Sequence, residues 1–154
     1  MNQSAFQESG VKLTGALRIE VIGEDGTIKD VREIPNLVVT TGKGVIADRM
    51  KGTPTKAAMT HMAVGTNNTT PAAGDTTLGA EVAGSRTALT STTVSGSVIT
   101  YVCSFAAGVG TGALVEAGIF NASSAGDMLC RTIFSVVNKG SSDSMTITWT
   151  VTIV

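Results

Sequence analysis

The chain has 154 residues, of which 42% are hydrophobic and only 15% are charged, and its formal net charge is -1 at pH 7. This length fits one domain built around a single core. An average soluble domain has about 25% charged residues, so the composition predicts a neutral, polar surface, and it argues against binding of DNA or RNA, which needs a basic field.

The first segment, residues 1–12, is polar apart from a few apolar side chains and shows neither a helical nor a strand period. Segments of this kind are predicted to form a flexible arm. Residues 13–22 and 28–34 then alternate between apolar and polar side chains on either side of the turn Glu24-Asp25-Gly26. This pattern predicts a first β-hairpin, and it places the single folded domain over residues 13–154.

One short helix is expected directly after this hairpin. Thr41 can cap its N-terminus, Val45, Ile46 and Met50 form a narrow apolar stripe, and Gly52 with Pro54 two residues later ends it. The predicted length is two to three turns.

The middle of the chain reads as strands separated by one long loop. Residues 59–64 are apolar enough for a buried strand, and residues 65–75 are almost all turn formers, which predicts the largest loop of the protein. Residues 87–94 and 97–105 alternate around Ser95-Gly96, which predicts a second hairpin with Ile99, Tyr101 and Cys103 on one face.

The last third of the chain carries the clearest strand signals. Residues 116–134 contain two apolar runs joined by a small, polar turn at 121–126, which predicts a hairpin with Phe120 and Phe134 on the core side. Residues 145–153 alternate without interruption, with the odd positions expected inward and the threonines outward. About eight antiparallel strands with one short helix predict an all-β fold, a two-sheet, jelly-roll-like β-sandwich.

Reactive groups are scarce in this sequence. The single histidine, His61, lies within an apolar run without an evident nucleophile or orienting carboxylate, so a structural role is expected. Glu116 lies at the start of a strand, where pairing with Arg131 across the hairpin is expected. Cys103 and Cys130 lie in apolar strands, which favours two reduced core thiols over a metal site. The sequence therefore predicts no enzyme, no catalytic residues, no cofactor and no metal.

Two further classes of site are disfavoured by their context. The glycines at 108–112 superficially resemble a dinucleotide loop, but the residues that follow them read as a strand rather than as the helix that this motif requires. No apolar stretch approaches the roughly 20 residues of a membrane-spanning helix, and the N-terminus lacks a signal-peptide pattern. We therefore expect no membrane partner and a cytoplasmic protein at synthesis.

Four segments together resemble a known group of proteins. They read NLVVTTGKGVIADRM (36–50), MAVGTNNTTPAAGDTTLGAEV (62–82), EAGIFNASSAGDMLCRTIF (116–134) and DSMTITWTVTIV (143–154). In this order they resemble small virion structural proteins of tailed bacteriophages, of the capsid decoration or cement type. The resemblance covers about residues 36–154, and it implies a β-sandwich or jelly-roll body.

The resemblance implies a protein on the outer surface of a phage head, made in the host cytoplasm, that stabilises the joints between capsid subunits. The expected partners are the major capsid protein and further copies of the chain, as a dimer or trimer. Contacts are expected from the arm and from the loop at 65–77, because both lack predicted structure of their own. The candidate contact residues are Phe6, Glu8, Val11, Thr66, Asn67, Asn68, Pro71 and Asp75.

The sequence leaves two alternatives open. Related segments also occur in tail-associated or fibre-associated phage proteins. A β-sandwich whose loops are rich in Asn, Thr and Asp is also compatible with a carbohydrate-binding module, although such sites usually need exposed aromatic side chains, and most aromatic residues of this chain are predicted to lie in the core.

Overall fold

The computed structural model describes residues 10–154, so the candidates Phe6 and Glu8 lie outside the described residues. Within this range the chain forms ten strands and one helix: β1 (Leu13–Ile22), β2 (Ile28–Pro35), β3 (Leu37–Val38), α1 (Thr40–Arg49), β4 (His61–Gly65), β5 (Thr87–Ala88), β6 (Ser91–Ser95), β7 (Val98–Phe105), β8 (Gly112–Phe120), β9 (Met128–Lys139) and β10 (Ser144–Ile153). The two strands beyond the eight expected are the two-residue β3 and β5.

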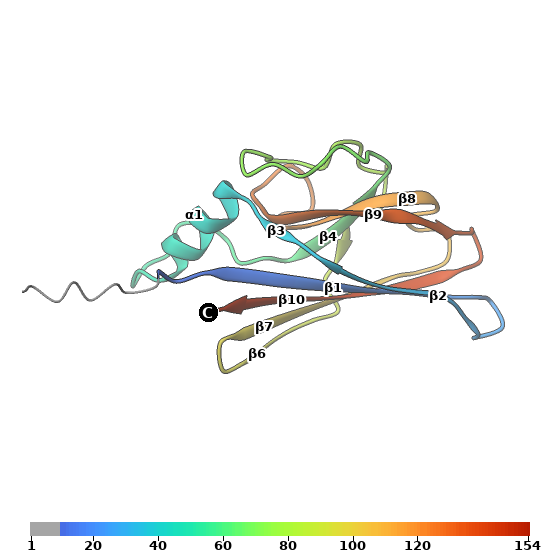
Figure 1. Ribbon diagram of the computed structural model, residues 1–154, viewed down its shortest axis with the longest axis horizontal. Helices are drawn as coiled ribbons and strands as arrows, with labels where there is room; N and C mark the ends of the chain where they lie inside the picture. The colour runs from blue at the N-terminus through green and yellow to red at the C-terminus, as the bar shows by residue number, and fades with distance from the viewer. Residues whose placement is uncertain (1–9) are drawn as a thin grey trace, which may run out of the picture.

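The strands form two antiparallel sheets of five, which confirms the predicted β-sandwich (Figure 1). Sheet A has the order β2-β1-β10-β7-β6, and sheet B has the order β3-β9-β8-β4-β5. The chain crosses from one sheet to the other directly after the first hairpin, where β2 belongs to sheet A and β3 pairs with β9 in sheet B.

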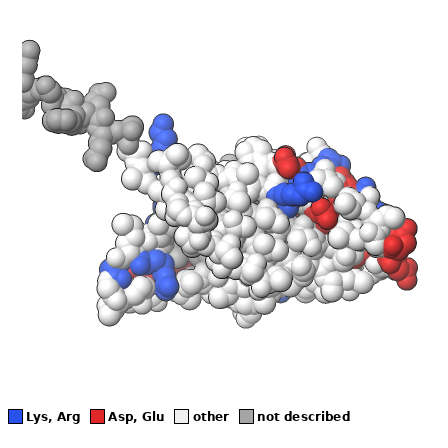
Figure 2. Space-filling view, turned by 90° about the horizontal axis from the view of Figure 1, so that it is seen from below, with Lys and Arg blue, Asp and Glu red and all other residues white. Residues whose placement is uncertain are grey.

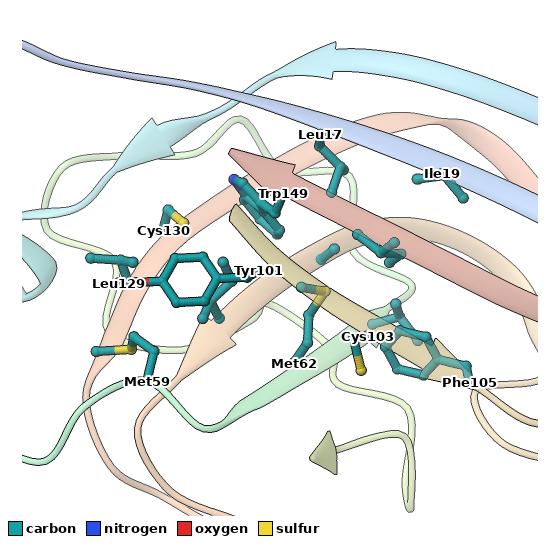
Figure 3. Close-up of a cluster of buried hydrophobic side chains, with 14 of the residues drawn as sticks. Leu17, Ile19, Met59, Met62, Tyr101, Cys103, Phe105, Leu129, Cys130 and Trp149 are labelled. Carbon is teal, nitrogen blue, oxygen red and sulfur yellow. The ribbon is translucent and has the colours of Figure 1, made fainter. Parts of the chain in front are cut away.

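The main core lies between the two sheets (Figure 3). The alternation predicted for the last strand is confirmed, because Met145, Ile147, Trp149 and Val151 are all buried. The other sheet contributes side chains such as Leu114 and Ile119, also fully buried. Burial of this apolar surface is the main force that holds the sandwich together.

The segment expected as one strand at 87–94 is divided between the sheets, so this prediction is wrong. Residues Thr87–Ala88 form β5 and pair with β4 in sheet B, whereas Ser91–Ser95 form β6 and pair with β7 in sheet A. Alternation gives the face of each side chain but not the sheet to which its strand belongs, so the sequence did not show this change of partner.

The helix is present, but its ends and its stripe differ from the prediction. It begins one residue before Thr41 and no side chain caps it, so the capping role is wrong. It ends at Arg49, and Asp48 then closes the following loop by accepting main-chain hydrogen bonds from Thr55 and Lys56 at 2.9 and 2.7 Å. Met50, expected on the apolar stripe, is 83% exposed.

A second, smaller core lies on the outer side of sheet B. It consists of Val39, Ala63, Leu78, Phe120 and Met128, and it is covered by the loop at 66–86, drawn in green across the top of Figure 1. Phe120 is thus buried, as predicted, but in this second core. Phe134 packs half-buried against the main core, so the two rings pack in different cores.

Candidate interaction surfaces

The loop at 66–86, which we call the cover loop, contains most of the contact residues expected from the sequence. It lies flat on sheet B because Leu78 packs onto Gly118 in the middle of β8, where a side chain at position 118 would collide with it. At its end, Arg86 stacks on the Phe120 ring at 3.6 Å from the centroid and donates to the carbonyl oxygen of Ala125 at 2.8 Å. The cover loop is therefore packed down at both its centre and its end.

A buried carboxylate holds the main chain of the cover loop. Glu116 is fully buried on the outward face of β8, and it accepts hydrogen bonds from the backbone N–H groups of Asn67 at 3.2 Å, Gly79 at 2.9 Å and Ala80 at 2.7 Å. Arg131 on β9 donates its Nε to Glu116 Oε2 at 2.9 Å, so the predicted pair is confirmed. Glu116 therefore satisfies main-chain donors that would otherwise be buried without a partner.

Asp75 extends this buried network to the loop surface. Its Oδ2 accepts from Arg131 Nη1 at 3.0 Å and from the N–H of Ala72 at 3.0 Å. The guanidinium of Arg131, on a side chain only 3% exposed, is thus flanked by two carboxylates. The two acids outnumber the one cation, so this network gives the loop no site for an anion.

The cover loop and β9 enclose a shallow depression of about 410 Å³. Asn67, Asp75 and Arg131 line it together with threonines and glycines of the loop. None of the described residues that line it is aromatic, so it has no platform on which a sugar ring could stack. What it offers a neighbour is a set of hydroxyl, amide and main-chain hydrogen-bonding groups.

The structure separates the predicted contact residues. Asn67 and Asp75 share the depression, where both are half-buried, and Pro71 is half-buried near β3. Thr66 and Asn68 are exposed. Val11, 79% exposed, instead lines an apolar groove of about 770 Å³ beside α1, together with side chains such as Leu13, Ile46 and Met50.

A third surface lies on the outer face of sheet A, and the sequence predicted only the part of it that β10 contributes. Because the odd residues of β10 point into the core, its even residues point outward, and the antiparallel register aligns them with outward residues of β7 and β6. We call this set the hydroxyl face: Ser91, Thr93, Ser95, Val98, Thr100, Val102, Ser104, Thr146, Thr148, Thr150 and Thr152. None of these residues is charged, and the row Thr93, Thr100, Thr150 crosses three strands.

The charges of sheet A lie at the margin of the hydroxyl face. On β1, Arg18 pairs with Glu20 at 2.9 Å and with Glu33 of β2 at 3.4 Å, so each of these charges has a partner of opposite sign. Figure 2, seen from the side on which β6 and β7 lie in Figure 1, shows a broad uncharged area between charged groups at the two ends of the molecule. The hydroxyl face is thus an uncharged sheet surface that a neighbour can cover without removing water from unpaired charges.

The two cysteines, the histidine and one buried lysine lie outside these surfaces. Cys103 and Cys130 are free and buried, as predicted, and burial raises the pKa of the Cys103 thiol to about 12 and also raises the pKa of Cys130. The half-buried His61 shares a hydrogen bond with Thr60 at 2.8 Å. Lys139 is buried and donates to the carbonyl oxygens of Ala106 and Asp143 at 2.9 and 2.7 Å, and burial lowers its pKa.

Within residues 10–154, no group of three or more His, Cys, Asp or Glu side chains is arranged to hold a metal ion. No helix in this part of the chain is both long and apolar enough to cross a membrane. Comparisons of the chain with protein-family models, with curated protein sequences and with solved structures find no match.

Proposed function

We propose that the chain is a non-enzymatic virion structural protein of the capsid decoration type, located on the capsid surface of a tailed phage and bound there to the major capsid protein. The four sequence segments that resemble such proteins support this, as does the two-sheet sandwich that the resemblance implies. The observation that carries the proposal is the hydroxyl face, an uncharged sheet surface that crosses β6, β7 and β10.

The chemistry of this face suits attachment to another protein surface. Threonine and serine hydroxyls hydrogen-bond to main-chain groups of a neighbour, and removing water from them costs less than removing it from a charge. Uncharged groups dominate the centres of protein interfaces in the same way. A protein that binds joined capsid subunits more tightly than separate ones stabilises the assembled shell by mass action, and many identical contacts add up over a lattice.

Three single substitutions distinguish the hydroxyl face from the cover loop as the docking surface. Thr100→Glu places a charge at the centre of the hydroxyl face, Asn68→Glu places one on the exposed cover loop, and Ser123→Glu places one on the exposed turn between β8 and β9. Each purified variant is added to shells of the encoding phage that lack the protein, and the bound fraction is measured by co-sedimentation.

We expect Thr100→Glu alone to abolish attachment, because the carboxylate would have to lose its water at the interface. If Asn68→Glu alone abolished attachment, the docking surface would be the cover loop, and the proposed decoration function would stand. Absence of the wild-type protein from complete particles would refute the decoration function. Its location in cryo-electron micrographs at the tail or fibre would favour the tail-associated alternative instead.

The carbohydrate-binding alternative has less support. The polar depression is the natural place for a sugar, but stacking on an aromatic ring supplies much of the affinity of such sites, and its described lining has no ring. Titration with a panel of bacterial surface glycans should give no binding. Saturable binding that Asp75→Ala abolishes would revive this alternative.

A further inference from the structure

We propose that β6 pairs with β6 of a second copy, antiparallel and about a two-fold axis at Thr93, so that two copies share one continuous ten-stranded sheet. The proposal goes beyond the proposed function, because the pairing is a property of the isolated protein. It rests on three observations: the nature of the edge strands of the sandwich, the main-chain hydrogen-bonding groups left free on β6, and the self-complementarity of the β6 sequence.

Four strands lie at the edges of the two sheets, and three of them are poor templates for pairing. β3 and β5 have only two residues each. β2 carries alternating charges from Lys29 to Glu33 and ends at Pro35, and charges and proline are the usual devices that protect an edge from a further strand. β6 has five residues, Ser-Thr-Thr-Val-Ser, which are all exposed and include neither a charge nor a proline.

The turn after β6 fixes which of its main-chain groups point away from sheet A. Ser95 and Val98 are paired across a two-residue turn that has Gly96 at φ 57°. This is the position where a hairpin turn of this kind favours glycine, and the residues that flank the turn form its hydrogen-bonded pair. Because bonded pairs alternate along an antiparallel ladder, the N–H and C=O groups of Thr92 and Val94 point outward, to the free edge.

These outward groups match a second copy of the same strand. With Thr93 on the two-fold axis, Thr92 of each copy lies opposite Val94 of the other, and both exchange two main-chain hydrogen bonds. Such an interface is isologous, with the same patch on both copies. The Thr93 side chains then face each other as a non-bonded pair, with Cα atoms about 4.5 Å apart, and no like charges meet.

The side chains around β6 also favour coverage of this edge. Val94 is 69% exposed and lies on the inward side of the strand, because its register partner Ile99 packs against the core. It lines an apolar pocket of about 410 Å³ with Ile46 and the exposed Met50. A five-residue strand pair alone buries less than the roughly 1,200–2,000 Å² of a stable interface, so the dimer is expected to be reversible, with the paired hydroxyl faces continuous across it.

Charge substitutions at the axis provide the test, with the full-length isolated protein and sedimentation velocity over a concentration series. The wild type should shift toward twice the monomer mass as its concentration rises. Thr93→Lys and Thr93→Glu should each remain monomeric, because each pairing would set like charges opposite one another. An equimolar mixture of the two variants should form a heterodimer that high salt weakens. Val31→Lys, on the opposite edge strand β2, is the matched control and should dimerise as the wild type does.

A second variant tests the hydrogen bonds without adding a charge. Val94→Pro removes an outward N–H group at a sheet edge, where proline is tolerated, and replaces one exposed apolar side chain with another, so it should keep the fold and abolish the dimer. A monomeric wild type at every concentration, or a dimer that both Thr93 variants retain, would overturn the proposal. These experiments contain no capsid, so a failure of the dimer does not count against the decoration function, which the shell-binding experiment tests separately.

Discussion

Glu116 allows the anchoring of the cover loop to be tested directly. In the variant Glu116→Gln the side chain keeps its size but loses its charge, and it replaces one acceptor oxygen with an NH₂ group that faces other donors. The carboxylate now accepts three main-chain hydrogen bonds, from Asn67, Gly79 and Ala80, besides the bond from Arg131. At least one of these donors must lose its partner.

The size of the effect follows from the burial of the pair. Glu116 is fully buried and Arg131 is 3% exposed, and breaking a buried ion pair by removing one partner costs about 3–5 kcal/mol. Arg131 keeps its bond to Asp75, so we expect the lower end of this range, about 3 kcal/mol of unfolding free energy. A surface pair is worth much less, typically below about 1 kcal/mol.

Urea unfolding measures the loss of stability, and amide hydrogen exchange measures the opening of the cover loop. The unfolding free energy should fall, and exchange at Gly79 and Ala80 should speed up more than exchange in β10, because the cover loop opens before the sandwich does. Glu20→Gln, which breaks only the exposed pair with Arg18, is the control and should change little. A loss from Glu116→Gln as small as the control's, or unchanged exchange at the two loop amides, would refute the anchoring role.

Three further predictions concern the helix, the loop after it and the core thiols. Gly42→Ala should destabilise the protein by more than about 1 kcal/mol in thermal unfolding, because the added Cβ would collide with a main-chain carbonyl of β9. At Gly44 the added Cβ has open space, so Gly44→Ala should stabilise the protein by about 0.5–1 kcal/mol in the same assay. A hydrogen bond from Lys51, and then one from the main chain, lowers the pKa of Asp48, so its stabilising contribution is present above the unfolded pKa of about 4 and is lost as the pH falls through the lower folded value. Asp48→Asn should therefore lower the melting temperature at pH 7 and reduce its further fall in acid; equal acid sensitivity of both proteins would contradict this. Both cysteines should resist a thiol reagent at pH 8 in the native protein and react in urea, since burial raises both pKa values, and rapid native labelling would show that the core opens at these strands.

Several features of this protein could be predicted from local pattern alone. The alternation of β10 showed which side chains enter the core, because a strand has a period of two residues and one face must avoid water. The turn between β6 and β7 was predicted one residue early, at Ser95-Gly96 instead of Gly96-Ser97. The hairpin itself and the pairing of Glu116 with Arg131 were predictable, because both depend on residues that are neighbours in a hairpin.

Other features depended on contacts between segments far apart in the chain. The cover loop reads as a long run of turn formers, and nothing in that run indicates that it packs onto sheet B. Its position depends on Glu116, 36 residues beyond Ala80 in the sequence, and on Leu78 packed at Gly118. The sequence also could not show that the segment at 87–94 changes sheets.

The candidate surfaces likewise depend partly on local pattern and partly on contacts between distant segments. The outward threonines of β10 followed from its sequence, but the hydroxyl face exists only because the register brings Thr150 beside Thr100 and Thr100 beside Thr93. The exposed edge of β6 likewise appears only in the tertiary structure, where β7 lies on one side of it and no strand from residues 10–154 lies on the other. The alternation of side chains along a strand is a local property of the backbone, so the sequence determines it. The partner of each strand depends on burial of the whole core, so only the tertiary structure decides it.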